Sequence, residues 1–502
     1  MNKKWRFEMK YICLDIGTTN VKGAIYDECS KLIYESSRNI KLLTPNTIMR
    51  EHDPNEILGH IRSILIELVS HIHERKEKVG FISISCYMHS LMLIDKEFKP
   101  LTNVILWNDA RASDIANLYR NTDIGMNIYY NTGTPIHPMS PLYKILYYKK
   151  HDIRKFNDAK MFVGIKEYIT YYMCGDWYID YSLASSTGLF DIHNYKWNKN
   201  ALELLEIDDT CLSKPVNTTF ILPNIKKEFL DDIGITYDIN IVIGASDGCL
   251  ANLGSHGIEL GTAVCTIGTS GAYRIVTDKP VLDREGRIFS YILNKDIYVS
   301  GGAINNGCIA YDFILNKLNY STHIDDIFEG IDYTKYGRGI VFLPFLSGER
   351  APYWDSELRS SILGLNQTHT RKDILYAAIK GISFAIKDVY EIINKAIGYN
   401  INKIYVNGGF TKSDIWVQTL SNILNKQIII SDNGNGPLLG AFILGMLAMN
   451  KIENIEKAEK FFTISKIFNS LDESFYNEEF NIYKKAIKLN TELFHELAKL
   501  AY

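Results

Sequence analysis

Two short stretches with the same pattern decide the fold of this chain. Cys13–Asp27 reads CLDIGTTNVKGAIYD, and Val264–Asp278, about 250 residues further on, reads VCTIGTSGAYRIVTD. In each stretch an Ile-Gly-Thr turn separates two runs rich in β-branched and aromatic residues, which is typical of two strands joined by a tight turn. We therefore predict two copies of one α/β unit facing each other across a cleft, while two unrelated hairpins are the simpler alternative.

The length and composition agree with a globular enzyme of two domains. The chain has 502 residues, of which 46% are hydrophobic and 23% are charged, and its net charge is −3. Because a single core rarely organises so long a chain, we expect a first domain over residues 9–255, a second over 256–455 and a helical tail over 456–502. The small net charge and the lack of a long basic stripe argue against nucleic acid as a partner. No apolar run is long enough to predict a membrane span.

Cysteine usage and the N-terminal stretch favour a reduced, cytoplasmic protein. The cysteines stand singly and form no CxxC pair, so neither a disulfide framework nor a zinc site is indicated. The opening MNKKWRFEMKYICLDIG has no apolar core and no small-residue cleavage site, and therefore does not resemble a signal peptide. Met9, which directly precedes a predicted strand, could equally be the natural start.

Three glycine-rich turns could hold phosphate groups. They are DIGTTN (Asp15–Asn20), IGTSG (Ile267–Gly271) and NGGF (Asn407–Phe410). Taken singly, each is more often structural, but backbone N–H groups gathered in such turns bind anions. The common phosphate loops and the protein-kinase motifs are absent from the sequence, so these turns form the predicted phosphate site. Asp15, at the end of a buried strand beside them, suits a Mg²⁺ ion held through water.

A lone aspartate raises a separate question. In Ile241–Gly248, IVIGASDG, the apolar run stops at Gly244, and Asp247 follows just before a second glycine. Aspartate is favoured as the N-cap of a helix. A carboxylate with an ordinary pKa near ~3.9 is also ionised at neutral pH and can accept a proton. The residues alone leave both roles open.

Over nearly its whole length the chain resembles the FGGY family of carbohydrate kinases, in the actin and hexokinase superfamily. The first family signature is similar to MSPLYKILY (Met139–Tyr147), although Tyr147 stands where the family usually carries Trp. The second is similar to SSILGLNQTHTRKDILYAAIK (Ser360–Lys380), with Lys380 at a position that is usually acidic or an amide. The segments CYMHSLMLID, ILWNDARA and LPFLSGERAPYW look most like those of gluconate kinases, and xylulose kinases share parts of them.

The resemblance implies two actin-like (ribonuclease H-like) α/β domains, with the sugar on the first and ATP on the second. It implies that Asp247 is the general base for a sugar hydroxyl and that Asp15 meets Mg²⁺ through water. The residues implied to face the sugar, besides Asp247, are Met88, His89, Trp107, Asn108, Asp109 and Arg111. Those implied to hold ATP are Thr18, Thr19, Gly268, Thr269, Asn306, Gly307, Gly409 and Ser413. On their own, His89 and Trp107 would more often be core residues.

The implied activity is ATP-dependent phosphorylation of the terminal hydroxyl of D-gluconate, giving 6-phospho-D-gluconate. Arg111, Lys166 and Arg350 are the candidates for the cation that meets the carboxylate. A xylulose kinase or another sugar kinase of the family is the first alternative. An actin- or chaperone-like ATPase would share the nucleotide loops but not the sugar-facing segments. Domain closure is expected to exclude water, and because the family often forms dimers, a homodimer is an alternative to a monomer.

Overall fold

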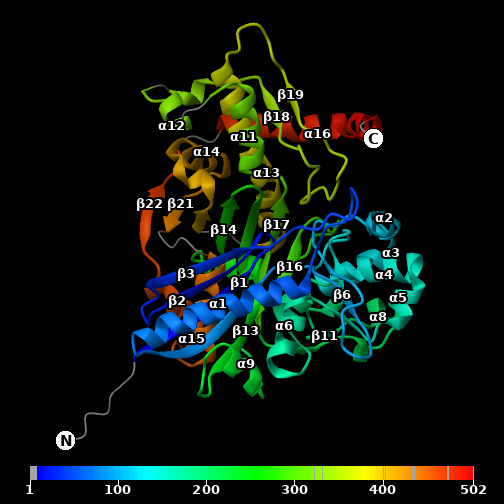
Figure 1. Ribbon diagram of the computed structural model, residues 1–502. Helices are drawn as coiled ribbons and strands as arrows, with labels where there is room; N and C mark the ends of the chain where they lie inside the picture. Colours follow the sequence, from blue (N-terminus) through cyan, green and yellow to red (C-terminus); the bar gives the residue numbers. More distant parts are fainter. Residues whose placement is uncertain are drawn as a thin grey trace, which may run out of the picture.

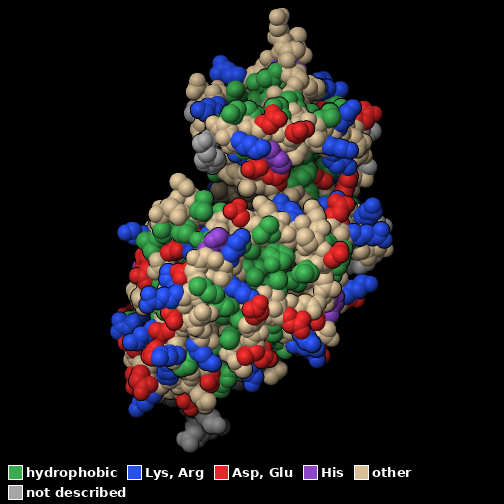
Figure 2. All heavy atoms as spheres, turned by 90° about the vertical axis from the view of Figure 1, so that its right-hand side faces the viewer, with side chains coloured by type: hydrophobic (Ala, Val, Ile, Leu, Met, Phe, Trp, Pro, Cys, Tyr) green, Lys and Arg blue, Asp and Glu red, His purple; other side chains and the backbone are tan. Residues whose placement is uncertain are grey.

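Two β-sheets with flanking helices form two bodies, one in the lower half of Figure 1 and one above it. The computed structural model describes residues 8–320, 323–330, 332–398, 401, 403–431, 436–471 and 474–500. Seen from the side, the molecule narrows where the two bodies meet, and acidic and basic side chains are interspersed on that face (Figure 2). Within the described ranges, no helix combines the length and apolar character needed to cross a bilayer.

The first sheet has five strands in the order β13-β5-β1-β2-β3. They are β1 (Met9–Ile16), β2 (Asn20–Tyr26), β3 (Leu32–Asn39), β5 (Lys78–Cys86) and β13 (Asn240–Ser246). The first three are antiparallel neighbours, and β5 runs parallel to both β1 and β13. The strand, turn and strand predicted for the opening stretch are therefore confirmed.

The second sheet repeats this topology. It has seven strands in the order β16-β17-β15-β14-β20-β21-β22. They are β14 (Thr262–Ile267), β15 (Gly271–Thr277), β16 (Phe289–Asn294), β17 (Ile297–Ile304), β20 (Lys403–Asn407), β21 (Ile428–Ser431) and β22 (Ile464–Phe468). The segment β17-β15-β14-β20-β21 matches β3-β2-β1-β5-β13 in order and in the direction of each pairing. The two turns quoted from the sequence are thus equivalent turns of a duplicated actin-like unit, as predicted.

Helices cover both faces of the first sheet, which is why its central strands are apolar almost throughout. In β1, Ile12 and Leu14 belong to the core shared with α1 (Pro54–Glu74), whereas Tyr11 belongs to the core shared with α15 (Gly436–Ala448). Alternate residues of a strand point to opposite faces. The second sheet packs against α13 (Arg371–Ile397) and α14 (Asp414–Leu424), and α16 (Ser474–Leu500) packs on these two helices.

Other elements complete the two domains. An insert between β5 and β13 lies on the right of Figure 1. The remaining elements of the first half are β4 (Glu51–His52), β6 (Met92–Ile94), β7 (Val104–Ile105), α2 (Ser113–Tyr119), α3 (Asp123–Thr132), α4 (Pro141–His151), α5 (Ile153–Asp158), β8 (Met161–Val163), α6 (Ile165–Cys174), β9 (Tyr178–Asp180), α7 (Tyr181–Ser185), β10 (Phe190–Asp191), β11 (Lys196–Trp197), α8 (Lys199–Leu205), η1 (Asp209–Cys211), β12 (Lys214–Val216) and α9 (Lys227–Asp232). The second half adds α11 (Cys308–Lys317), α12 (Ile324–Ile327), η2 (Tyr333–Lys335), β18 (Val341–Leu343), β19 (Ser361–Leu363), η3 (Gly409–Lys412) and η4 (Ile455–Phe461).

One helix pair joins the two halves of the chain. α10 (Asp247–Leu253) packs closely against α15, although α15 lies between β21 and β22 of the second sheet in the sequence and covers the first sheet. Glycines make this approach possible: a Cβ at Gly440 would lie 2.2 Å from the Leu250 carbonyl oxygen, and one at Gly254 would lie 1.9 Å from the Gly436 carbonyl oxygen. Residues 464–468, within the tail expected to be helical, form β22 at the edge of the second sheet instead.

Candidate active site

A cavity of about 320 Å³ lies between the two domains. The first domain lines it with the β1–β2 turn, the residues after β5, Trp107 and the start of α10, and the second lines it with the β14–β15 turn, β15, β16 and the segment around Arg350. Among the lining residues are Thr18, Met88, His89, Trp107, Asp247, Gly248, Ser270, Arg274, Tyr291, Arg350 and Trp354. Residues from both quoted stretches therefore meet in one place.

Asp247 is the first residue of α10 and lines the cavity. The N-cap of this helix is Ser246, whose Oγ accepts a hydrogen bond from the N–H of Cys249 at 3.3 Å. The Asp247 carboxylate accepts a hydrogen bond from the N–H of Gly248 at 2.7 Å. The N-cap explanation of Asp247 is therefore wrong, and its carboxylate is available to the cavity.

A bulge brings Asp247 to this position. The apolar run was expected to stop at Gly244, but β13 continues to Ser246, and its register against β5 shifts around the glycine. Gly244 has a φ of 70°, and a Cβ there would lie 2.0 Å from the carbonyl oxygen of Ile84. Only glycine can adopt this positive φ and also approach the neighbouring strand so closely. Gly244 therefore bends the strand just before the Asp247 carboxylate.

The pKa of Asp247 is raised to about 7, first by burial and then by the negative charge of Asp15, against the lowering effects of the Gly248 hydrogen bond and Arg274. This corrects the expectation of an ordinary pKa. Asp15, near the end of β1, accepts a hydrogen bond from Ser85 Oγ at 2.7 Å, and burial raises its pKa as well. Asp15 and Asp247 thus both have raised pKa values at the same edge of the sheet. A cation bound nearby would stabilise the ionised form of each carboxylate.

The predicted phosphate turns border the cavity from both sides. Thr18 lines it from the β1–β2 turn, and Thr19 is the exposed residue beside it. In the second domain, Gly268 and Thr269 occupy the equivalent β14–β15 turn, from which Ser270 reaches the cavity. The two turns are thus placed where one anionic ligand could contact both.

The third glycine-rich turn lies against the second. Gly408 has a φ of 105°, and a Cβ there would lie 2.4 Å from the carbonyl oxygen of Ile267, so the geometry requires this glycine more than the exposed Gly409 that follows it. Gly307 packs on the same turn, because its N–H donates to the Thr269 carbonyl at 3.1 Å. These glycines assemble one glycine-rich surface at the ends of β14 and β20.

Two other residues expected to contact ATP are already engaged. Asn306 is fully buried, and its Nδ2 donates to the carbonyl oxygen of Gly348 at 2.7 Å. Ser413 is the N-cap of α14, accepting from the N–H of Trp416 at 3.1 Å, and its hydroxyl donates to Asp325 Oδ1 at 2.6 Å. Both side chains hold neighbouring loops in place.

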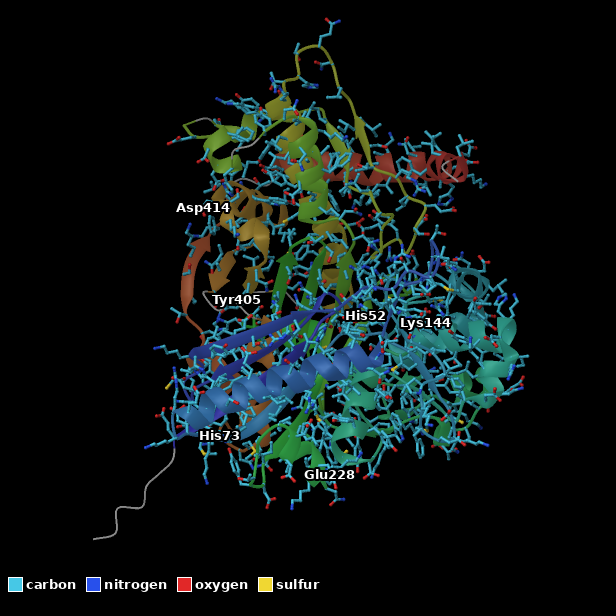
Figure 3. All side chains as sticks on the ribbon, in the orientation of Figure 1. His52, His73, Lys144, Glu228, Tyr405 and Asp414 are labelled. Atoms are coloured by element: carbon cyan, nitrogen blue, oxygen red, sulfur yellow. The ribbon has the colours of Figure 1, made fainter. Side chains whose placement is uncertain are left out.

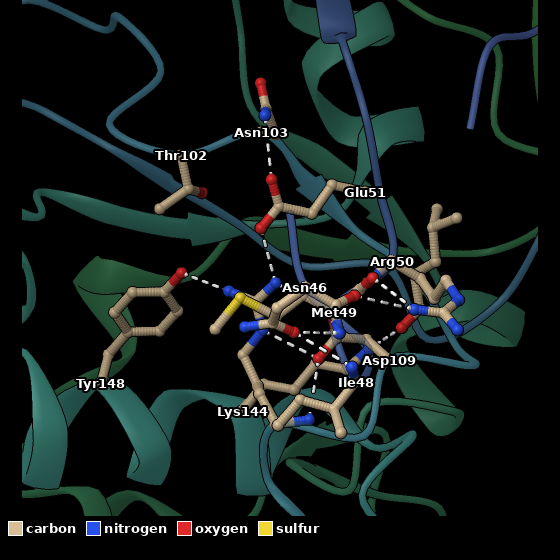
Figure 4. Close-up of polar contacts among 12 residues, drawn as sticks. Asn46, Ile48, Met49, Arg50, Glu51, Thr102, Asn103, Asp109, Lys144 and Tyr148 are labelled. Carbon is tan, nitrogen blue, oxygen red and sulfur yellow. Dashed lines mark hydrogen bonds and ion pairs between the residues drawn. The ribbon is translucent and has the colours of Figure 1, made fainter. Parts of the chain in front are cut away.

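The sugar-facing prediction divides into two groups. Met88, His89 and Trp107 line the cavity, whereas Asn108 is exposed outside its lining. Asp109 and Arg111 belong to a buried ion-pair network behind it, part of which Figure 4 displays.

In that network four of the five N–H donors of the Arg111 guanidinium are engaged. It makes two hydrogen bonds of 2.8 Å to the Asp109 carboxylate, one of 2.8 Å to the Tyr148 hydroxyl and one of 2.5 Å to Glu51. Asp109 also accepts the N–H of Arg50 at 2.7 Å. Because two carboxylates already pair with this buried cation outside the cavity lining, its role here is to fix the segments around residues 50 and 109.

Lys144, on α4 in the helical insert (Figure 3), is a residue whose role the sequence did not reveal. It is completely buried, and its Nζ donates to the carbonyl oxygens of His89 at 2.6 Å and Leu106 at 2.7 Å. Burial lowers its pKa to about 7. One ammonium group thereby ties together the two sugar-facing segments, and its place in the first family signature was the available signal.

His89 is held as a neutral imidazole. Its Nδ1 lies 2.7 Å from the carbonyl oxygen of Ser186, which can only accept, so Nδ1 carries the proton. Burial, followed by the positive charge of Lys144, lowers its pKa to about 3. The unprotonated Nε2 is 3.5 Å from the Tyr291 hydroxyl, and both residues line the cavity.

Of the three proposed cations, Arg350 lines the cavity. Lys166 is buried behind β13, where its Nζ pairs with Asp180 at 2.7 Å and donates to the Ala245 carbonyl at 3.2 Å. Arg350 stacks on Trp107, with its Cζ 4.8 Å from the ring centroid. A second cation in the lining, Arg274, was not among the predicted residues, although it lies within the stretch that predicted the fold.

Two matched sheets with a cavity between them, bordered by glycine-rich turns from both halves, define the actin-like class of two-domain α/β proteins. The chain belongs to the FGGY family of carbohydrate kinases: the N-terminal domain of the family matches residues 10–254 and the C-terminal domain matches residues 263–449. It is therefore a carbohydrate kinase, which implies ATP as the phosphoryl donor. This confirms the resemblance and decides against an actin- or chaperone-like ATPase.

Several characterised relatives lie at moderate identity. A gluconokinase of Bacillus subtilis (strain 168) is 36% identical over 454 residues, covering 88% of this chain and 88% of that protein. A xylulose kinase of Staphylococcus epidermidis is 29% identical over 499 residues, covering 96% of this chain and 97% of that protein. Among solved structures, a ligand-bound xylulose kinase from Lactobacillus acidophilus superposes with a TM-score of 0.93 at 30% identity, covering 97% and 100% of the two chains. A gluconate kinase from the same organism superposes with a TM-score of 0.89 at 31% identity, covering 98% of each chain.

Proposed function

We propose that this kinase transfers the γ-phosphoryl group of ATP to the terminal hydroxyl of D-gluconate, giving 6-phospho-D-gluconate and ADP. The observation that carries the proposal is Asp247, a carboxylate with a pKa near 7 in a cavity bordered by phosphate-type turns from both domains. The choice of gluconate is supported by gluconokinase relatives at 36% and 35% identity. A cytoplasmic location and a homodimer stay predictions.

In the proposed step, Asp247 accepts the proton of the acceptor hydroxyl. A bond forms between the hydroxyl oxygen and the γ-phosphorus, and the bond from that phosphorus to the β–γ bridging oxygen breaks, leaving on ADP. Because the transition state is loose, the protein mainly aligns the groups and stabilises charge. A base whose pKa lies near the working pH is well matched to this task.

The chain's own groups fit a nucleotide with its magnesium ion. Backbone N–H groups of the turns at Thr18–Thr19 and Gly268–Thr269 would hold the phosphates. No cluster of three His, Cys, Asp or Glu side chains able to bind a metal occurs among the residues that the structure describes, so Mg²⁺ would be held chiefly by phosphate and water, with Asp15 as its protein partner. When bound, the ion neutralises phosphate charge.

An acceptor panel tests the substrate. ADP release is measured with Mg-ATP and D-gluconate, D-xylulose or no sugar. Release that depends on gluconate, with at least ~10-fold lower kcat/KM for xylulose, is the expected result. Release with xylulose alone would refute the proposed substrate. Xylulose is the second candidate because the xylulose kinase structure gives the higher TM-score, 0.93 against 0.89.

A further inference from the structure

Two arginines from the second domain face the cavity beside Asp247. Arg274 lies on β15, and a Cβ placed on Gly248 would be 3.7 Å from its Nη2 and 3.9 Å from its Nε. The guanidinium of Arg274 therefore lies over the residue that follows Asp247. Arg350 reaches the same cavity, with its guanidinium stacked on Trp107.

Arg274 lies close enough to Asp247 for the two charges to interact, but no hydrogen bond joins the two side chains. Its Nε is buried without a hydrogen bond, and its side chain makes no hydrogen bond or ion pair with any residue in the described ranges. Arg350 is anchored by Nε to Asn305 Oδ1 at 2.7 Å and by Nη2 to the Ile304 carbonyl at 3.1 Å, while its Nη1 makes no hydrogen bond within those ranges. Both arginines are half-buried at the wall of the cavity, so these open donors are placed to bind an anion inside it.

The two neighbouring carboxylates, Asp247 and Glu349, accept hydrogen bonds from other groups and from neither guanidinium. Glu349, next to Arg350, accepts hydrogen bonds from the Asn305 N–H and from Asn306 Nδ2, and burial raises its pKa to about 7. Burial lowers the pKa of Arg350 to about 10, with Arg274 contributing in the same direction. Because the pKa values of Asp247 and Glu349 are both raised to about 7, these carboxylates are only partly ionised at neutral pH, and the two guanidinium groups keep net positive charge in the cavity.

The position of Arg274 separates it from the phosphate turns. It lies three residues beyond Gly271, the first residue of β15, which is about 10 Å along a strand. It stands on the same face as Ala272, and its cross-strand neighbours are Gly301 and Val264. Ala272 is small and lines the cavity together with Arg274. Because this part of the cavity lies beyond the phosphate turns, it suits the acceptor better than ATP.

We propose that Arg274, with Arg350 as the second cation, binds the carboxylate of the acceptor and selects a sugar acid over neutral sugars. This inference rests on the proposed function and adds to it the residues that determine the substrate class. A guanidinium presents two parallel N–H donors that match a carboxylate, and a neutral hydroxyl in the same place leaves the charge unpaired.

The test compares D-gluconate with D-gluconamide, which differs only in its uncharged end. For each acceptor, kcat and KM are measured with the wild type, Arg274→Gln, Arg274→Lys and Arg62→Gln, the last a surface arginine paired with Asp232. Arg274→Gln should raise the KM for gluconate by on the order of 10²-fold, while kcat/KM for gluconamide changes by less than about threefold. Arg274→Lys should recover part of the loss, and Arg62→Gln should match the wild type.

The outcomes separate the two claims. A wild type that releases no ADP with gluconate refutes the proposed function, and this inference with it. A wild type that uses gluconate, but whose preference over gluconamide survives in Arg274→Gln, overturns the inference alone. An equal loss with both acceptors also overturns it, because it would place Arg274 on the transferred phosphate or in the fold. If gluconamide turnover is too slow to measure, calorimetric titration of gluconate into folded Arg274→Gln decides, since unchanged binding would contradict the proposal.

Discussion

At the scale of single residues, the pKa of Asp247 is the property with the clearest consequence for activity. Its raised value, about 7, means that the base is only partly ionised at neutral pH in the free enzyme. Because only the ionised carboxylate accepts a proton, kcat/KM for gluconate should rise with pH and level off above about 7. A pH profile from 5.5 to 8.5 measures this, and a flat profile would contradict the assignment.

The same shift predicts an effect on stability. Because the folded-state pKa of Asp247 is raised above the ordinary value of 3.8, its protonated carboxyl group contributes stability at acid pH. That contribution is lost as pH rises through about 7. Asp247→Asn should therefore raise the melting temperature at pH 8 by about 2 °C or more, with a smaller gain at pH 5.

Asp232→Asn is the matched control for that experiment. The hydrogen bond to Arg62 lowers the pKa of Asp232, so the ionised carboxylate of Asp232 stabilises the fold, the opposite of Asp247. Asp232→Asn should therefore be less stable than the wild type at pH 8. If both variants changed stability in the same direction, the burial of the Asp247 carboxylate would not explain its effect.

Lys144 gives a prediction about positioning. Its two hydrogen bonds, to the carbonyl oxygens of His89 and Leu106, join the sugar-facing segments. Lys144→Met removes the donor to the His89 carbonyl and leaves the Leu106 carbonyl with only the N–H of Asp109. This should cost about 1–3 kcal/mol of unfolding free energy and raise the KM for the acceptor more than the KM for ATP. Denaturant unfolding and steady-state kinetics measure the two effects, and an unchanged KM for the acceptor would contradict the role.

At the scale of elements, the crossing of α10 and α15 depends on glycine. Gly440→Ala would push a Cβ against the Leu250 carbonyl oxygen, 2.2 Å away, and should destabilise the fold by about 1–3 kcal/mol. Gly59, on the exposed side of α1, has nothing within 4 Å of an added Cβ. Gly59→Ala should instead stabilise by ~0.5–1 kcal/mol. Thermal melts of the two variants compare them directly, and equal effects would contradict the close packing.

The elements also mark how far the sequence could predict the structure. The β-strands at both Ile-Gly-Thr turns were predictable, because runs of β-branched and aromatic residues and the turn residues between them are local signals. The bulge at Gly244 was not, since its cause is the carbonyl oxygen of Ile84 on a neighbouring strand. The contacts of Arg111 with Glu51 and Tyr148 and the unbonded Nε of Arg274 likewise depend on long-range packing, so a single arginine in either segment looks the same in the sequence.

At the scale of the whole molecule, the duplication explains the site. Equivalent hairpins bring Thr18 and Ser270 to opposite sides of one cavity, and the sugar-facing residues enter from an insert that only the first half carries. A kinase built in this way can exclude water by moving one domain toward the other once both substrates are bound. Sequence could predict this arrangement because the repeat is visible in two short stretches.

The most direct test of the central claim is to identify the product and the base together. The kinase is incubated with Mg-ATP and D-gluconate, and added 6-phosphogluconate dehydrogenase reports the 6-phosphate through NADPH. We expect one NADPH per ADP with the wild type and with Asp232→Asn, and a loss of about 10²–10⁴ in kcat with Asp247→Asn. ADP without NADPH, or an Asp247→Asn variant as fast as the wild type, would contradict the account.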